Sequence, residues 1–105
     1  MEQQKIQEMQ MLEQTLQNLL MQKQSFQMEL SETESALEAI ENSGDEVFKI
    51  IGQLMIKAEK SNMKEELESK KKMLELRTKT MESQESSLTE QLEKLREEII
   101  KTTKK

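Results

Sequence analysis

Residues 47–57, VFKIIGQLMIK, are the segment of the chain most informative about its fold. It contains the β-branched pair Ile50 and Ile51, the only valine of the chain and one of its two phenylalanines, and Gly52 interrupts it. Enrichment in β-branched and aromatic residues, broken by a glycine, predicts two short strands joined by a tight turn at Gly52 and Gln53. A short apolar run can also be helical, so an apolar helical insert is the alternative.

A heptad repeat precedes this stretch. Its apolar side chains recur with alternating spacings of three and four residues, which is typical of a coiled-coil seam. The repeat predicts a long helix within residues 1–42, and the turn signal Asn42-Ser43-Gly44-Asp45 predicts its end. Two members of the seam, Lys23 and Thr33, are polar. The seam residues are Met9, Leu12, Leu16, Leu19, Lys23, Phe26, Leu30, Thr33, Leu37 and Ile40.

A second repeat follows the stretch and predicts a helix within residues 60–105. Ser61, with Asn62 beside it, is the predicted N-cap of this helix. Between Lys64 and Leu88 every other seam position is polar, which makes the seam too weak for a rigid two-chain zipper. The apolar positions are Leu67, Leu74, Met81, Leu88, Leu92, Leu95 and Ile99, and the polar ones are Lys64, Lys71, Thr78 and Glu85.

Folding the chain back at residues 43–59 places the two seams opposite each other. Five pairs then have residue numbers with the same sum: Leu37 with Leu67, Leu30 with Leu74, Leu16 with Leu88, Leu12 with Leu92 and Met9 with Leu95. Because one antiparallel register accounts for all five pairs, we predict a mainly α fold. The prediction is a long antiparallel helical coiled-coil hairpin with one central β-hairpin, forming a single domain over residues 1–105.

Composition excludes several classes of protein. Hydrophobic residues make up 33% of the chain and charged residues 35%, with no Pro, Trp or Tyr, which is typical of long helices and not of a closed globular core. The chain has no His and no Cys, so it cannot form a zinc site, an iron–sulfur cluster, a disulfide, a thiol nucleophile or a histidine base. We therefore expect no catalytic residue, no metal and no cofactor.

Charge and hydropathy disfavour two classes of partner, nucleic acids and membranes, and indicate a cellular location. The net charge of −5 disfavours binding to a phosphate backbone, and the lysine runs 70–72 and 104–105 lack the interleaved aromatic residues that stack on bases. We expect no nucleic-acid partner. No apolar run approaches the roughly 20 residues that cross a bilayer, so we expect no membrane partner and a cytoplasmic location.

The predicted β-hairpin is the first candidate interaction site. An isolated two-stranded hairpin is marginally stable in water, and its open edges pair readily with other chains. We therefore predict that hairpins of several subunits assemble into an intersubunit β-barrel, and the alternative is a hairpin packed on its own helices. The assembly residues are Val47, Phe48, Ile50, Ile51, Gly52, Leu54, Met55 and Ile56.

The free ends of the two helices are the second candidate site, because antiparallel pairing brings them together. Apolar residues gather there, including methionines, whose flexible side chains suit surfaces that accept many partners. The predicted binding residues are Ile6, Met9, Met11, Leu12, Leu95, Ile99 and Ile100, with Met1 beside them. Met9, Leu12 and Leu95 are better interpreted as seam residues. Ile6, Met11 and Ile100 are better interpreted as parts of a contact surface.

The order of these features resembles the β class of prefoldin subunits. The resemblance spans essentially the whole chain, and its most specific part is Phe48, Gly52 and the short strand Leu54-Met55-Ile56-Lys57. It implies a hexameric, ATP-independent chaperone of two α-class and four β-class subunits, whose strands form a barrel platform. It also implies that the arm tips hold non-native polypeptides and deliver them to a group II chaperonin.

Two other classes of protein compete with this interpretation. A structural coiled-coil adaptor, forming a dimer with one specific partner, is the leading alternative, although the half-polar second seam and the β segment disfavour it. An enzyme is the third class. Acidic pairs such as Glu65-Glu66 and Glu97-Glu98 are helix neighbours and not converging carboxylates of a pocket, so we expect no catalysis.

Overall fold

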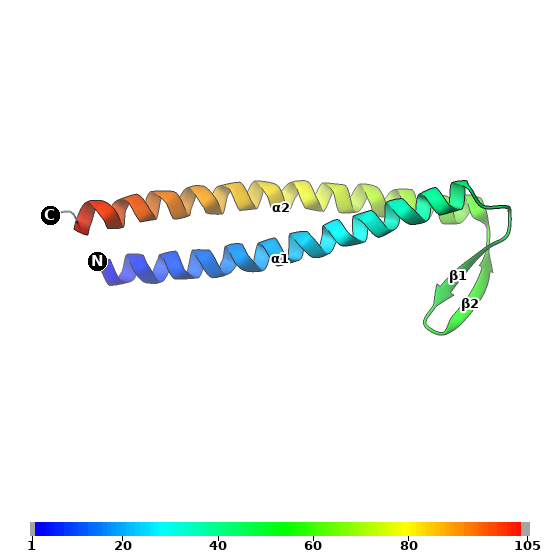
Figure 1. The fold of residues 1–105 in the computed structure, drawn as a ribbon, viewed down its shortest axis with the longest axis horizontal. Helices are drawn as coiled ribbons and strands as arrows, with labels where there is room; N and C mark the ends of the chain where they lie inside the picture. Colours follow the sequence, from blue (N-terminus) through cyan, green and yellow to red (C-terminus); the bar gives the residue numbers. More distant parts are fainter. Residues whose placement is uncertain (1, 104–105) are drawn as a thin grey trace. The chain divides into compact units, whose positions relative to one another are not determined.

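The computed structural model describes residues 2–103, so Met1 and the lysine run 104–105 lie outside the described residues. Helix α1 (Glu2–Glu41) is followed by strands β1 (Val47–Ile51) and β2 (Leu54–Ala58) and by helix α2 (Lys60–Thr103) (Figure 1). This order confirms the mainly α fold with one central β-hairpin.

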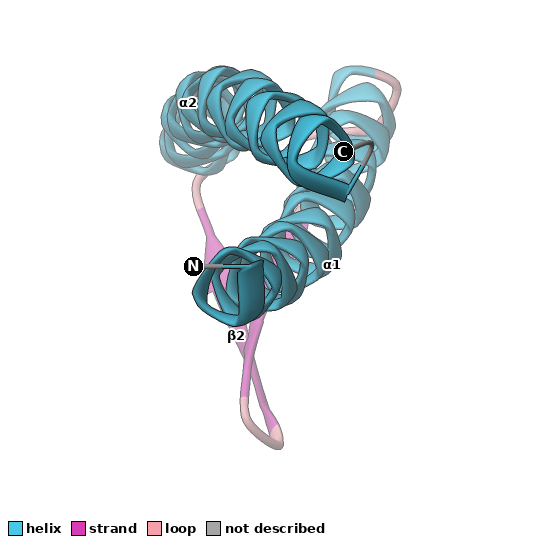
Figure 2. Cartoon of the chain, turned by 90° about the vertical axis from the view of Figure 1, so that its left-hand side faces the viewer, coloured by secondary structure: helices cyan, strands magenta, loops and turns pink. Residues whose placement is uncertain are grey.

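The two strands pair in antiparallel order, with Val47 opposite Ala58 and Ile51 opposite Leu54. They form a twisted ribbon that loops connect to the helices (Figure 2). Gly52, the first residue of the two-residue turn, has a φ of 60°, and among the described residues no non-glycine residue has a positive φ. A glycine in this conformation at the first turn position is typical of a type II′ hairpin turn. The strand interpretation is therefore confirmed, and the helical insert is wrong.

Substituting Gly52 with alanine will weaken the hairpin through the backbone alone, because an added Cβ meets nothing within 4 Å. A left-handed conformation costs an L-residue about 1 kcal/mol, so the ladder amides of β1 and β2 are expected to exchange with deuterium roughly fivefold faster. Gly44→Ala is the matched control, since its Cβ also meets nothing but its φ is not left-handed. Equal exchange in the two variants would contradict this account of the turn.

Short polar contacts fix both helix ends next to the hairpin. At the end of α1, the Ser43 amide and hydroxyl both donate to the Ile40 carbonyl, at 3.2 and 2.8 Å. The Lys60 ammonium donates to the Ser43 carbonyl at 2.9 Å, which ties the start of α2 to this turn. The predicted N-cap at Ser61 is wrong. The helix begins earlier, with the Met63 amide donating to the Glu59 carbonyl at 3.0 Å, because only Glu59 separates β2 from α2.

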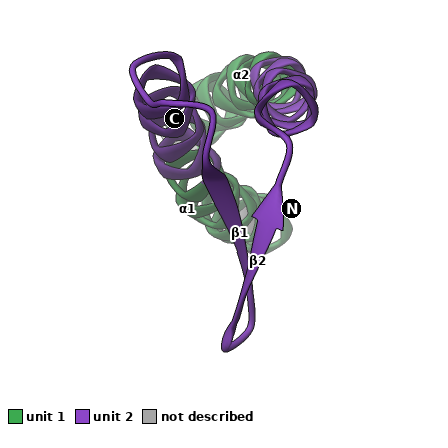
Figure 3. Ribbon diagram, turned by 90° about the vertical axis from the view of Figure 1, so that its right-hand side faces the viewer, with its two compact units in different colours: residues 1–25, 78–105 green, residues 26–77 purple. Residues whose placement is uncertain are grey.

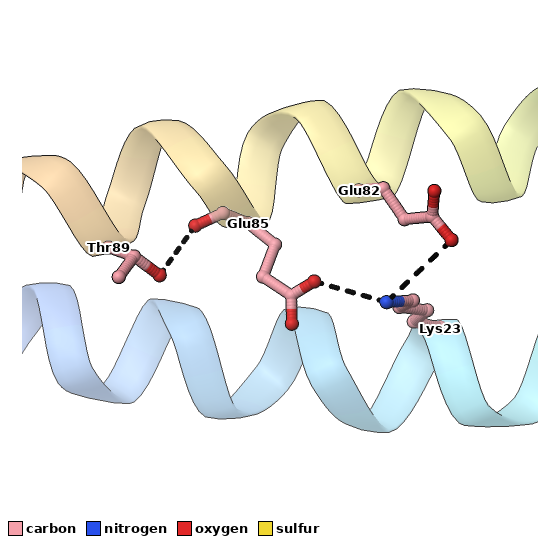
Figure 4. A network of polar contacts seen from close by, with 4 residues as sticks. All are labelled: Lys23, Glu82, Glu85 and Thr89. Carbon is pink, nitrogen blue, oxygen red and sulfur yellow. Dashed lines mark hydrogen bonds and ion pairs between the residues drawn. The ribbon is translucent and has the colours of Figure 1, made fainter.

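The chain divides into two compact units, residues 1–25 with 78–105 and residues 26–77 (Figure 3). In the first, unit 1, the seam leucines Leu19, Leu92 and Leu95 are buried. The polar seam residue Lys23 donates to Glu85 Oε2 at 3.1 Å and lies 3.9 Å from Glu82 Oε1 (Figure 4). Apart from Thr78, the seam residues of unit 1 are thus apolar with one charged layer.

In the second unit, unit 2, the core contains Leu74, which is 1% exposed, together with Ile40 and Val47. Thr33 is buried as well, and its hydroxyl donates to the Glu29 carbonyl at 2.8 Å, so the second polar member of the seam is satisfied within its own helix. The Arg77 guanidinium lies 5.7 Å from the centroid of the Phe26 ring, a cation–π distance.

Ion pairs in each unit agree with the predicted antiparallel register. In unit 1, the Lys5 ammonium lies 3.5 Å from the Glu98 carboxylate. The predicted register places Lys5 opposite Ile99, the residue that follows Glu98. In unit 2, Lys64 pairs with Glu41 at 3.5 Å, next to its expected partner Ile40.

Replacing both Lys23 and Glu85 with leucine will raise the thermal unfolding midpoint. The pair is partly buried, and an apolar pair of similar volume avoids the cost of removing two charges from water. Thermal unfolding followed by far-ultraviolet circular dichroism measures the midpoint. Glu85→Leu alone should lower it, because Lys23 then keeps only the 3.9 Å contact with Glu82. A double variant less stable than the original protein would show that the charged layer is itself stabilising.

Candidate interaction surfaces

The β-hairpin presents apolar side chains on both of its faces. Because side chains alternate across a strand and cross-strand partners share a face, one face carries Phe48, Ile50 and Met55, and the other carries Ile51, Leu54 and Ile56. All six side chains are exposed. A two-stranded ribbon usually has one polar face, so two exposed apolar faces make this hairpin a candidate surface for contact with another chain.

Only the base of the hairpin is fixed to the helices of unit 2. Val47 is buried, its partner Ala58 is half-buried, and Lys49 on the same face donates to Glu66 Oε2 of α2 at 3.1 Å. Of the predicted assembly residues, Val47 therefore belongs to the core, and Gly52 shapes the turn. The remaining six stay exposed. The alternative prediction, a hairpin packed on its own helices, holds only at this base.

The predicted binding residues of the free ends differ in burial. Leu95 is 8% exposed and belongs to the core of unit 1, while Met9, Leu12 and Ile99 are half-buried along the seam. Their side chains face the partner helix because they occupy the 3–4 repeat. Ile6, Met11 and Ile100 fall outside the repeat and are exposed. We refer to these three as the end residues.

The structure brings two of the end residues to the same end of unit 1. The ion pair between Lys5 and Glu98 places the first turns of α1 beside the last turns of α2, and these turns carry Ile6 and Ile100. Met11 is five residues from Ile6, which is roughly 140° around the helix axis, so it projects from another face of α1. The end residues are therefore not one contiguous patch.

Sequence analysis did not single out several exposed apolar residues of the helices. Met21 and Met28 of α1 and Met73 of α2 are exposed, and all lie outside the seams. The exposure of these methionines can be predicted from their heptad positions, since an apolar residue out of register with a heptad seam cannot be buried by that seam.

Metal-holding groups and membrane-spanning helices were both sought among residues 2–103. Among residues 2–103 there is no group of three or more His, Cys, Asp or Glu side chains arranged to hold a metal ion. No helix in that part of the chain is both long enough and apolar enough to span a membrane.

Comparisons with known proteins identify relatives of this fold. The curated prefoldin subunit beta of Thermococcus onnurineus (strain NA1) is 42% identical over 57 residues, which are 52% of this chain and 49% of that protein. This match spans about half the length of that relative. The crystal structure of the prefoldin beta subunit from Thermococcus strain KS-1 matches with a TM-score of 0.88 and 35% identity, over 96% of this chain and 90% of that one.

A family model confirms the resemblance found in the sequence. The model described as Prefoldin subunit matches residues 3–105, which is nearly the whole chain. Together with the one hairpin between two long helices, this match shows that the chain belongs to the prefoldin subunit family.

Proposed function

We propose that the chain is the β-class subunit of an ATP-independent, hexameric chaperone that contains two α-class and four β-class subunits. Membership in the prefoldin family implies a chaperone-type function, and members of this family are chaperone components and not enzymes. The observation that carries the proposal is the hairpin, which exposes apolar side chains on both faces.

The hairpin is the assembly site in this proposal. Its six exposed apolar side chains become buried when strands of neighbouring subunits pair with its open edges and close a shared barrel. Burying apolar surface contributes about 25 cal/mol per Å², so several side chains per subunit can drive assembly without a helix interface. The base, fixed through Val47 and the Lys49–Glu66 ion pair, then sets the direction in which each helix pair leaves the platform.

The free ends of the helices hold the client in this proposal. Ile6, Met11 and Ile100 offer weak apolar contacts, and several arms act on one non-native polypeptide at a high effective concentration. No single tight site is needed, and release requires only a competing surface. We propose a group II chaperonin as the recipient and the cytoplasm as the location.

Native mass spectrometry of the assembly purified through this chain from its own cells tests the proposal. The expected particle has six subunits, four of this chain and two of a longer, α-class chain. The same particle should suppress the aggregation of a chemically denatured protein in the absence of ATP. A dimer with one fixed partner that ignores the denatured protein would favour the coiled-coil adaptor and overturn the proposal.

A further inference from the structure

Helix α1 carries a second 3–4 repeat, roughly half a turn away from its seam. Its members are six glutamines and one methionine, and every one of them is exposed. We call this set the glutamine stripe: Gln3, Gln7, Gln10, Gln14, Gln17, Met21 and Gln24. The exposed side chains of Met11 and Asn18 lie beside it, so the outer face of α1 within unit 1 has no charge.

An absence of charge along the whole length of unit 1 is specific to this face. Outward positions of coiled-coil helices are usually charged, because charged side chains interact well with water. The corresponding face of α2 in unit 1 is uncharged only between residues 80 and 87. Elsewhere it follows this rule, with exposed Lys79, Glu90, Glu93, Lys94, Glu97 and Lys101. In α1, Lys5 and Lys23 pair with glutamates of α2, and Glu8 and Glu13 occupy positions that flank the seam. The stripe therefore differs from the rest of a chain in which 35% of residues are charged.

The side chains of the stripe match the chemistry of an unfolded backbone. A carboxamide has both an acceptor oxygen and two donor hydrogens, as a peptide group has an acceptor and a donor. Within the described residues, the carboxamides of Gln7, Gln10, Gln14 and Gln17 make no hydrogen bond to another protein group. The exposed methionines Met11 and Met21 add polarisable apolar contacts that tolerate many side-chain shapes.

We infer that the glutamine stripe binds extended segments of non-native polypeptide whatever their charge. This inference rests on the proposed chaperone function and extends the client-binding surface from the end residues along the outer face of α1. An uncharged face neither attracts nor repels a client by the sign of its charge. A charged face would repel clients of its own sign and would make binding depend on salt.

The test uses the assembled particle and two versions of one apolar unfolded peptide, flanked by lysines or by glutamates. The stripe variant is Gln10→Glu, Gln14→Glu and Gln17→Glu, which changes charge at constant shape. The control is Ser83→Glu, Ser86→Glu and Gln91→Glu, which adds the same charge to exposed positions of α2 in the same unit. Fluorescence anisotropy measures peptide affinity, and circular dichroism and native mass spectrometry check folding and assembly.

The original particle should bind both peptides equally well. The stripe variant should bind the glutamate-flanked peptide about tenfold more weakly than the original does, with the loss recovered at high salt, while the control changes by less than about threefold. Equal responses of the two variants would overturn the inference and leave the proposed function intact. A stripe variant with altered subunit number would overturn it in favour of contact between arms. An original particle that binds neither peptide would overturn the proposed function itself.

Discussion

Replacing Ile50 and Ile56 with aspartate will leave the chain folded but unable to assemble. The two positions lie on opposite faces of the hairpin, so the double variant places a carboxylate on each apolar face. Burying an unpaired carboxylate costs several kcal/mol, and every interface that this chain makes in the proposed platform would carry that cost. Native mass spectrometry should show monomers in place of six-subunit particles, while circular dichroism should show unchanged helix content.

A matched control separates the hairpin from exposed apolar surface in general. Ile50 and Ile56 are 69% and 46% exposed, and Met28 and Met73, on the helices of the same unit, are 64% and 47% exposed. Met28→Glu and Met73→Glu therefore add the same charge at the same exposure. The control should assemble as the original does. An intact oligomer in the Ile50→Asp and Ile56→Asp variant would refute the β platform.

Substituting the three end residues with serine will remove most of the holding activity and preserve the assembly. Ile6, Met11 and Ile100 are exposed, so serine at these positions leaves no cavity. Each apolar contact with a client contributes about 1 kcal/mol, so the loss of three lowers the affinity of one arm about a hundredfold. Light scattering of a denatured client with substoichiometric particle measures the effect.

The choice of these three residues makes that experiment interpretable. Serine at Leu95, Met9, Leu12 or Ile99 would remove packing from the seam of unit 1 and confuse unfolding with loss of binding. Met28→Ser with Met73→Ser is the control for exposed apolar residues elsewhere. If holding activity survives in the variant of the three end residues, the ends of the helices are not the client-binding surface.

Sequence alone predicts the fold because its signals are periodic. The seam of α1 and the seam of α2 give the register, and the ion pair between Lys5 and Glu98 agrees with it to within one residue. The turn at Gly52 is equally clear, since this glycine interrupts an apolar stretch that contains Val47, Ile50, Ile51 and Ile56. The predicted N-cap of α2 at Ser61 is wrong because the capping chemistry of Ser61 is only a local signal. The connection between β2 and α2 is the single residue Glu59, whose carbonyl accepts from the Met63 amide.

The interaction surfaces are less predictable from the sequence. Apolar content at the chain ends points equally to Leu95 and Ile100, and the heptad position alone separates the buried Leu95 from the exposed Ile100. The contact of Lys49 with Glu66 joins positions far apart in sequence through two flexible side chains, and no periodicity encodes such a contact. The spacing of the glutamine stripe can be read from the sequence. Its exposure to solvent follows only once the opposite face of α1 is known to be the buried seam.

The hairpin, which is apolar on both faces, also affects the concentration at which this chain stays soluble in a cell without its partners. A copy without partners exposes six large apolar side chains on a ribbon with open strand edges. Such a surface is itself what a quality-control system recognises, and its self-association rises with concentration. In the proposed assembly, partners stabilise the chain by mass action, so we expect its abundance to follow theirs. We therefore expect the cell to synthesise this chain and its proposed partners in matched amounts, because residues 47–57 of a chain without partners stay exposed.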